Sequence, residues 1–180
     1  RMFDAAAGLL GIKAVMAYEG QAAMLMEGLA QRYGDILPLD QGWRIDQGRL
    51  DLLPLLAVLA DEKNAERGAA MFHATVVAAI ADWVRTLAPG ARAVVGSGGC
   101  FLNQVLVRGL RARLGAQGVQ IIEARQVPPN DGGLSVGQAW VALQHLLEDA
   151  GRERRRVLAD VGPVPVADLH QSQGLEDVDG

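Results

Sequence analysis

Apolar residues recur at intervals of three and four along much of the chain, which is the spacing of one face of an α-helix. The longest such pattern predicts a helix over about residues 65–87, and Pro89-Gly90 ends it. Shorter patterns predict further helices at 2–10, 20–33, 102–114 and 133–149. Residues 52–59 are expected to begin another helix. The last helix is expected to bury its apolar side chains, which are Val136, Ala139, Trp140, Leu143, Leu146 and Leu147.

Two apolar runs lack the helical spacing and predict short strands. The first, Arg92–Gly96, leads directly into Ser97-Gly98-Gly99 and is expected to be buried, and the second is Val119–Ile122. The segment 36–49 is interrupted by proline and glycine and predicts a loop with a brief strand. The order strand, glycine turn, helix, strand and helix is typical of an α/β fold with parallel strands.

The length of 180 residues suits one domain or one lobe of a larger protein, and a hydrophobic fraction of 50% is enough to build a core. We expect a helix-rich α/β lobe over residues 1–150. A loosely ordered tail is expected over 151–180, where acids and prolines replace large apolar residues. Because the chain begins at Arg1 and enters a helical pattern almost at once, it is predicted to be a piece of a longer protein.

The charge and the cysteine content exclude several classes of function. A net charge of -4 argues against a nucleic-acid-binding protein, and the basic run 152–156 is interpreted as a solvated helix end. Cys100 is the only cysteine, so an internal disulfide and a CxxC zinc site are both excluded, and a cytoplasmic location is expected. The sequence shows neither a signal peptide nor an apolar run of the roughly 20 residues that a membrane helix needs.

The glycine turn after the first predicted strand is the strongest local signal for chemistry. Gly98 and Gly99 would let the backbone approach a ligand, and the following helix would present free N–H groups to an anion or nucleotide. Such turns also occur only to let a helix pack close to a sheet, so that alternative stays open. Asn103 is placed one turn into the helix, either with its amide over the glycines or as a polar residue on the exposed face.

A second glycine turn, Asn130-Asp131-Gly132-Gly133, precedes the last helix. Asn130 or Asp131 could be its N-cap, or the carboxylate of Asp131 could hold a metal ion at the mouth of the sheet. The helix dipole alone favours Glu19 near a helix N-terminus. His73 is interpreted as a satisfied, half-buried histidine rather than a base, and Cys100 as a packing residue rather than a nucleophile.

Five blocks of sequence, in this order, resemble the C-terminal end of the hydrogenase maturation carbamoyltransferases, the HypF family. The blocks are Arg1-Met-Phe-Asp4-Ala, Tyr18-Glu19-Gly20-Gln21-Ala-Ala, Phe72-His73-Ala-Thr, Ser97-Gly98-Gly99-Cys100-Phe101-Leu102-Asn103 and Val127-Pro128-Pro129-Asn130-Asp131-Gly132-Gly133-Leu134. The resemblance covers about residues 1–148 and extends more distantly to tRNA threonylcarbamoyladenosine transferases and O-carbamoyltransferases. It implies the C-terminal lobe of a two-lobed, ATP-binding, ribonuclease H-like fold similar to actin, Hsp70 and sugar kinases.

The resemblance also implies a reaction. The family uses carbamoyl phosphate and ATP to form carbamoyl adenylate. It then carbamoylates the C-terminal cysteine of a HypE-like partner, and that group becomes the cyanide ligand of nickel–iron hydrogenase. By resemblance, Asp4 contacts the ribose, and Gly98, Gly99 and Asn103 hold ATP or the adenylate. Asp131 would bind a divalent metal ion, which could be iron, zinc or magnesium, and Glu19 and Gln21 would face the cleft.

The sequence departs from the family pattern in one respect. The family's preceding lobe carries a pair of histidines that complete the metal site, but His73, His145 and His170 lack the HxxxH spacing. Complete catalysis by this chain alone is therefore not expected. Two alternatives stay open: an O-carbamoyltransferase or kinase of the same fold, and a non-catalytic, truncated lobe that acts as an interaction module.

Overall fold

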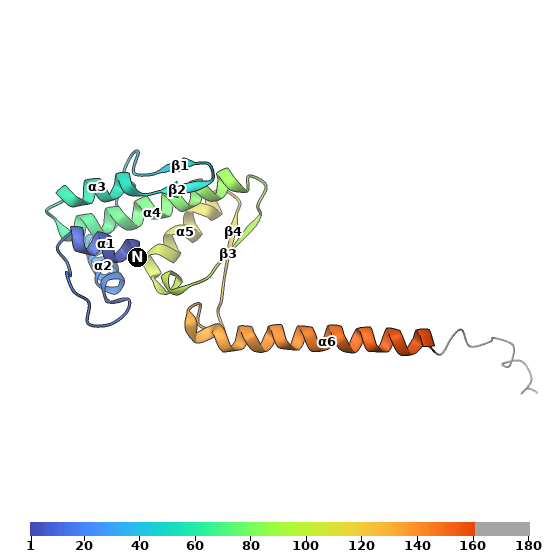
Figure 1. Cartoon of the computed structure of the whole chain (residues 1–180). Coiled ribbons are helices and arrows are strands. Elements are labelled where there is room, and N and C mark those ends of the chain that lie inside the picture. The colour runs from blue at the N-terminus through green and yellow to red at the C-terminus, as the bar shows by residue number, and fades with distance from the viewer. Residues whose placement is uncertain (161–180) are drawn as a thin grey trace, which may run out of the picture. The chain divides into compact units, whose positions relative to one another are not determined.

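The computed structural model describes the backbone of residues 1–160 and the side chains of residues 1–153 (Figure 1). The chain divides into two compact units, Arg1–Gly133 and Leu134–Gly180. The first unit contains five of the α-helices and all the strands that the structure describes. It is a helix-rich α/β unit, as the sequence predicted.

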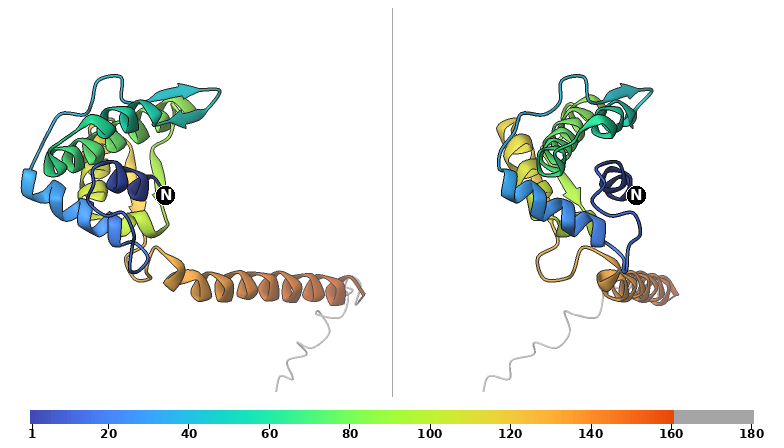
Figure 2. Two further views of the ribbon diagram at one scale, coloured as in Figure 1. Left: turned by 60° about the vertical axis from the view of Figure 1, so that its left-hand side comes forward. Right: turned by 90° about the vertical axis from the view of Figure 1, so that its left-hand side faces the viewer.

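The centre of the first unit is the helix α4 (Ala65–Leu87), which is buried along most of its length. The helices α2 (Gln21–Tyr33) and α5 (Gln104–Ala116) pack along it, and α1 (Met2–Leu9) and α3 (Leu53–Asp61) complete the cluster (Figure 2). These bounds confirm the helices predicted at 2–10, 20–33 and 65–87. α4 begins at Ala65 because the side chain of Asn64 accepts a hydrogen bond of 3.0 Å from the backbone N–H of Arg67.

Small residues let these helices approach closely. The buried face of α4 is rich in alanine, and a Cβ atom at Gly109 of α5 would lie 2.8 Å from the Val77 side chain of α4. With small side chains at the contact, the helix axes come close and the few large core residues, such as Phe72 and Met26, fill the remaining space. The composition therefore explains a tight helical core that contains few aromatic rings.

Two parallel strands, β3 (Ala93–Gly96) and β4 (Gln120–Glu123), follow α4 and α5, and both were predicted within one residue. Ala93 pairs with Gln120 and Gly96 with Glu123, so the two strands end at the same edge. The expectation that the first strand is buried is wrong, because Val94 is half-buried whereas Val95 is 77% exposed. α5 connects the strands and packs against β4, while the second face of the sheet carries the exposed Val95.

The segment predicted as a loop with a brief strand forms an antiparallel hairpin of β1 (Arg44–Asp46) and β2 (Arg49–Asp51). Gln47 and Gly48 both have positive φ and form its two-residue turn. The indole nitrogen of Trp83 in α4 donates a hydrogen bond of 2.8 Å to the carbonyl oxygen of Gly48. The hairpin is therefore anchored on the central helix.

The second unit contains the helix α6 (Leu134–Asp160), and residues 161–180 lie outside the described residues. α6 was expected to end near residue 149, but it continues to Asp160, into the segment predicted as a tail. The prediction that its apolar side chains are buried is also wrong. The structure exposes all six of them, which are Val136, Ala139, Trp140, Leu143, Leu146 and Leu147. Within the described part of this unit, α6 has no second helix or strand against which to bury them.

Candidate functional site

The two glycine turns that the sequence singled out lie next to each other. The first follows β3 and the second follows β4, and the parallel register places the ends of both strands at one edge. The backbone N–H of Gly98 donates a hydrogen bond of 2.6 Å to the carbonyl oxygen of Pro129. Loops at the carboxyl ends of parallel strands are the usual location of ligand sites in α/β folds.

The glycines at the end of β3 and in the first turn serve different purposes. A Cβ atom at Gly96 would overlap the ring of Phe101, so this glycine is needed for packing. Gly98 has a φ of +100°, which favours glycine, and a Cβ atom at Gly98 or at Gly99 would meet no atom within 4 Å. The packing alternative therefore applies to Gly96, whereas Gly99 borders open space that a ligand could occupy.

Asn103 does not lie where the sequence placed it. A short 3₁₀-helix, η1 (Gly99–Leu102), follows the turn, so α5 begins only at Gln104 and Asn103 is its N-cap. The side chain is buried rather than exposed, and its Oδ1 accepts a hydrogen bond of 2.9 Å from the N–H of Leu106. Its amide nitrogen lies 3.0 Å from Nε2 of His73. Asn103 is therefore the N-cap rather than a residue one turn into the helix, and the alternative that placed it on the exposed face is wrong.

His73 is 1% exposed and both ring nitrogens are engaged. Nδ1 lies 2.8 Å from the carbonyl oxygen of Ala69, one helical turn earlier in α4, and Nε2 faces the Asn103 amide. Burial lowers the pKa of the imidazole, although the hydrogen bond to Ala69 and the charge of Glu27 act in the opposite direction. The interpretation of His73 as a satisfied histidine is confirmed, but it is almost fully buried rather than half-buried.

Asn130 and Asp131 have different roles in the second turn. Oδ1 of Asn130 accepts a hydrogen bond of 3.2 Å from the N–H of Gly132 at the start of the 3₁₀-helix η2 (Asp131–Gly133). The carboxylate of Asp131 is exposed and, within residues 1–153, makes no hydrogen bond or ion pair. Asn130 is therefore the capping residue, and Asp131 remains available to a ligand.

The other residues implied by the resemblance lie in α1, in the segment before α2 and at the first position of α2. Asp4 is half-buried in the first turn of α1, and its carboxylate makes no hydrogen bond or ion pair with a described residue. Its neighbour Phe3 packs edge-on against the ring of His73, with centroids 5.4 Å apart. Glu19 is exposed, and Oε1 of Gln21 accepts a hydrogen bond of 2.8 Å from the N–H of Ala17, so that oxygen is used locally.

The donors for a complete metal site do not come together in the part of the chain that the structure describes. No group of three or more His, Cys, Asp or Glu side chains gathers there. Cys100 in η1 is exposed, so the interpretation of Cys100 as a packing residue is wrong. No described helix is long and apolar enough to cross a membrane.

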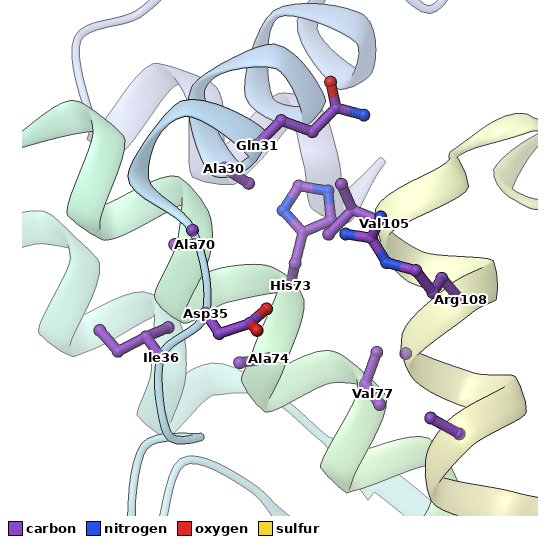
Figure 3. Close-up of a pocket in the computed structure, with 13 residues that line it drawn as sticks. Ala30, Gln31, Asp35, Ile36, Ala70, His73, Ala74, Val77, Val105 and Arg108 are labelled. Carbon is purple, nitrogen blue, oxygen red and sulfur yellow. The ribbon is translucent and has the colours of Figure 1, made fainter.

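A cavity of about 520 Å³ lies among α2, α4 and α5, with His73 in its wall (Figure 3). None of the residues that the sequence assigned to the site lines it. Asp35 and Arg108 lie on opposite sides of His73 and bring one negative and one positive charge to the cavity. Sequence reasoning missed both, because neither belongs to a motif and the fold alone brings them together.

Comparison with known proteins identifies the family. Residues 1–138 match the model of the carbamoyltransferase, Kae1-like domain, second subdomain, and the chain belongs to this family. It is 52% identical to carbamoyltransferase HypF2 of Cupriavidus necator, with 80% of this chain and 21% of the relative covered. It is 39% identical to carbamoyltransferase HypF of Rhizobium leguminosarum bv. viciae, with 88% of this chain and 21% of the relative covered. The chain thus spans about a fifth of the length of these curated relatives.

Solved structures give the same result. The crystal structure of full-length HypF in a phosphate- and nucleotide-bound form matches with a TM-score of 0.67 and 33% identity, over 80% of this chain and 20% of that one. HypF of T. kodakarensis matches with a TM-score of 0.63 at 24% identity, over 81% of this chain and 20% of that one, which supports the fold. The chain corresponds to a C-terminal part of HypF.

Proposed function

We propose that this chain is the nucleotide-binding lobe of an ATP-dependent carbamoyltransferase of the HypF type in the cytoplasm. The observation that carries the proposal is the pair of glycine turns, joined by the Gly98–Pro129 hydrogen bond, with open space over Gly99. The similar full-length HypF has been solved in a nucleotide-bound form, which supports the same role here. In the complete enzyme, a preceding lobe of a ribonuclease H-like fold would close over the adenylate.

The reaction proposed for the complete enzyme uses carbamoyl phosphate and ATP to form carbamoyl adenylate. The carbamoyl group then passes to the C-terminal cysteine of a HypE-like partner. The contribution of this chain is binding and orientation. Asp4 is proposed to accept hydrogen bonds from the ribose, and the backbone at Gly98 and Gly99 to lie against the nucleotide.

The structure adjusts the role proposed for Asn103. Its Oδ1 and one amide hydrogen are used in bonds to Leu106 and His73, so only the second amide hydrogen remains for a nucleotide. We propose that Asn103 acts mainly by holding the start of α5 beside the turn. Glu19 and Gln21 stay proposed as residues that face the cleft.

The metal site is proposed to be shared with the preceding lobe. Asp131 fits a divalent ion as one ligand, because its carboxylate is exposed, has no partner among residues 1–153 and supplies the oxygen donor that iron, zinc or magnesium can accept. Since the described residues bring no further ligands together, the remaining donors would be the histidines of the preceding lobe, and no step is assigned to the metal in this chain.

A chimera tests this function. The matched segment of C. necator HypF2 is replaced by this chain, and carbamoylation of a HypE-like partner's C-terminal cysteine is followed by mass spectrometry. The proposal predicts transfer that requires both carbamoyl phosphate and ATP, whereas HypF2 that lacks the segment is inactive. A folded chimera that binds ATP but transfers no carbamoyl group would favour another enzyme of this fold.

A further inference from the structure

A chain of short contacts connects the centre of α4 to the glycine turn. Nδ1 of His73 is bonded to the Ala69 carbonyl, and Nε2 to the amide of Asn103. The backbone N–H of Asn103 donates a hydrogen bond of 3.1 Å to the carbonyl oxygen of Cys100, and that of Phe101 donates one of 3.0 Å to Gly98. The imidazole is therefore linked through one side chain and one 3₁₀-helix to the turn itself.

The hydrogen-bond pattern fixes the chemical form of His73. Oδ1 of Asn103 accepts from the N–H of Leu106, so the amide nitrogen must be the atom that faces His73. Because that nitrogen only donates, Nε2 must be the unprotonated acceptor and Nδ1 must carry the hydrogen that is donated to Ala69. Rotating the Asn103 side-chain amide by 180° would place its NH₂ group against the backbone N–H of Leu106, where no hydrogen bond can form. The neutral Nδ1–H tautomer is therefore the form that fits.

We propose that His73 is a positioning residue for the Gly98–Gly99 turn: its neutral imidazole holds Asn103, and Asn103 holds the start of α5 against the 3₁₀-helix that begins at Gly99. That this turn receives a nucleotide rests on the proposed function. The positioning itself rests on the contacts within this chain.

Several charged groups surround the imidazole and set the conditions for the contact. Glu27 of α2 favours the protonated form, and its carboxylate also accepts a hydrogen bond of 2.7 Å from the backbone N–H of Gln104. Asp35 and Arg108 line the same cavity on opposite sides of His73 and carry opposite charges, and α1 contributes the uncharged ring of Phe3. Protonation would place an N–H of His73 against the amide N–H of Asn103 and break the contact.

The test uses the 180-residue chain with His73→Gln, His73→Phe and, as a matched control, His145→Gln, which changes an exposed histidine of α6. Glutamine can still accept from Asn103, whereas phenylalanine keeps the ring but has no acceptor. We expect His73→Phe to shift the NMR amide signals of Gly98 and Gly99 and to weaken ATP binding about tenfold. The amide signals and the ATP affinity of His73→Gln and of the control should stay close to those of the unmodified chain.

Acidification provides an independent readout if the phenylalanine variant does not fold. In the unmodified chain, the amide signals of Gly98 and Gly99 should move with the same midpoint as the His73 ring, and they should not move in His73→Gln. Signals that stay fixed while the ring titrates would overturn the proposal, as would a folded His73→Phe chain with unchanged amide signals. If the unmodified chain binds no ATP, the proposed function fails, whereas these amide signals still decide the positioning.

Discussion

The backbone nitrogen of Gly98 lies 2.6 Å from the carbonyl oxygen of Pro129, and this hydrogen bond joins two turns that are far apart in the sequence. The first turn leaves β3 and the second leaves β4, so the bond closes the edge where both strands end. The carboxylate of Asp131, which has no bonded partner among residues 1–153, lies two residues after Pro129. One edge therefore carries both glycine turns and the carboxylate of Asp131.

Gly96 and Gly99 are expected to respond differently to the same substitution. Gly96→Ala should destabilise the chain by about 1–3 kcal/mol, because the new methyl group overlaps the Phe101 ring in a buried position. Gly99→Ala should change stability little, since its methyl group meets open space. Urea unfolding of both variants measures the difference, and equal losses of stability would contradict the distinction between a packing glycine and a site glycine.

Stability should depend on the protonation of His73. Its pKa is lowered in the folded chain, so the unfolded chain binds the proton first as the pH falls. The contribution of neutral His73 to stability is complete above the pKa of His73 in the unfolded chain, near 6.5. It is lost as the pH falls from there toward the lowered pKa of the folded chain. The slope should not exceed about 1.4 kcal/mol per pH unit. Urea unfolding between pH 7.5 and 5.5 should show a smaller decrease in the free energy of unfolding for His73→Gln than for the unmodified chain. An equal decrease in the two chains would contradict this prediction.

Asp131→Asn should leave the stability of the chain unchanged, because Asn130 is the cap and Asp131 has no bonded partner among residues 1–153. In the HypF2 chimera, the same change should lower metal affinity by about an order of magnitude or more, since it removes the anionic oxygen and keeps the shape. Asn130→Ala serves as the contrast and should destabilise the turn. Metal content that does not change in the Asp131 variant would refute the ligand role.

Cys100→Ser should retain most carbamoyl transfer in the chimera. The thiol is exposed in η1, but the sulfur that accepts the carbamoyl group is proposed to belong to the partner protein. Serine keeps the size of the side chain and removes the nucleophilic thiol. Initial rates of carbamoylation test this, and a complete loss of transfer in a folded variant would show that Cys100 takes part in the chemistry.

The sequence predicted the positions of the helices and strands better than the partners and burial of their side chains. The spacing of apolar residues predicted α4 at 65–87 because one face of that helix is buried over most of its length, from Gly68 to Ala81. The partner of Asn103 could not be predicted, because His73 is remote in sequence and a 3₁₀-helix shifts the start of α5. The Gln47-Gly48 turn was missed because glutamine gives a weaker hairpin signal than asparagine.

The proposed function depends on nucleotide binding at the turn of Gly98 and Gly99, which titration of ATP into the 180-residue chain measures. Gly99→Val is compared with Gly115→Val, because a Cβ atom at either position meets no atom within 4 Å and Gly115 lies in α5 away from the turn. We expect ATP to shift the amide signals of Gly98 and Gly99 in the unmodified chain and in Gly115→Val, and we expect Gly99→Val to abolish the effect while remaining folded. Equal ATP affinity in the two valine variants, or no response at the turn in the unmodified chain, would contradict it.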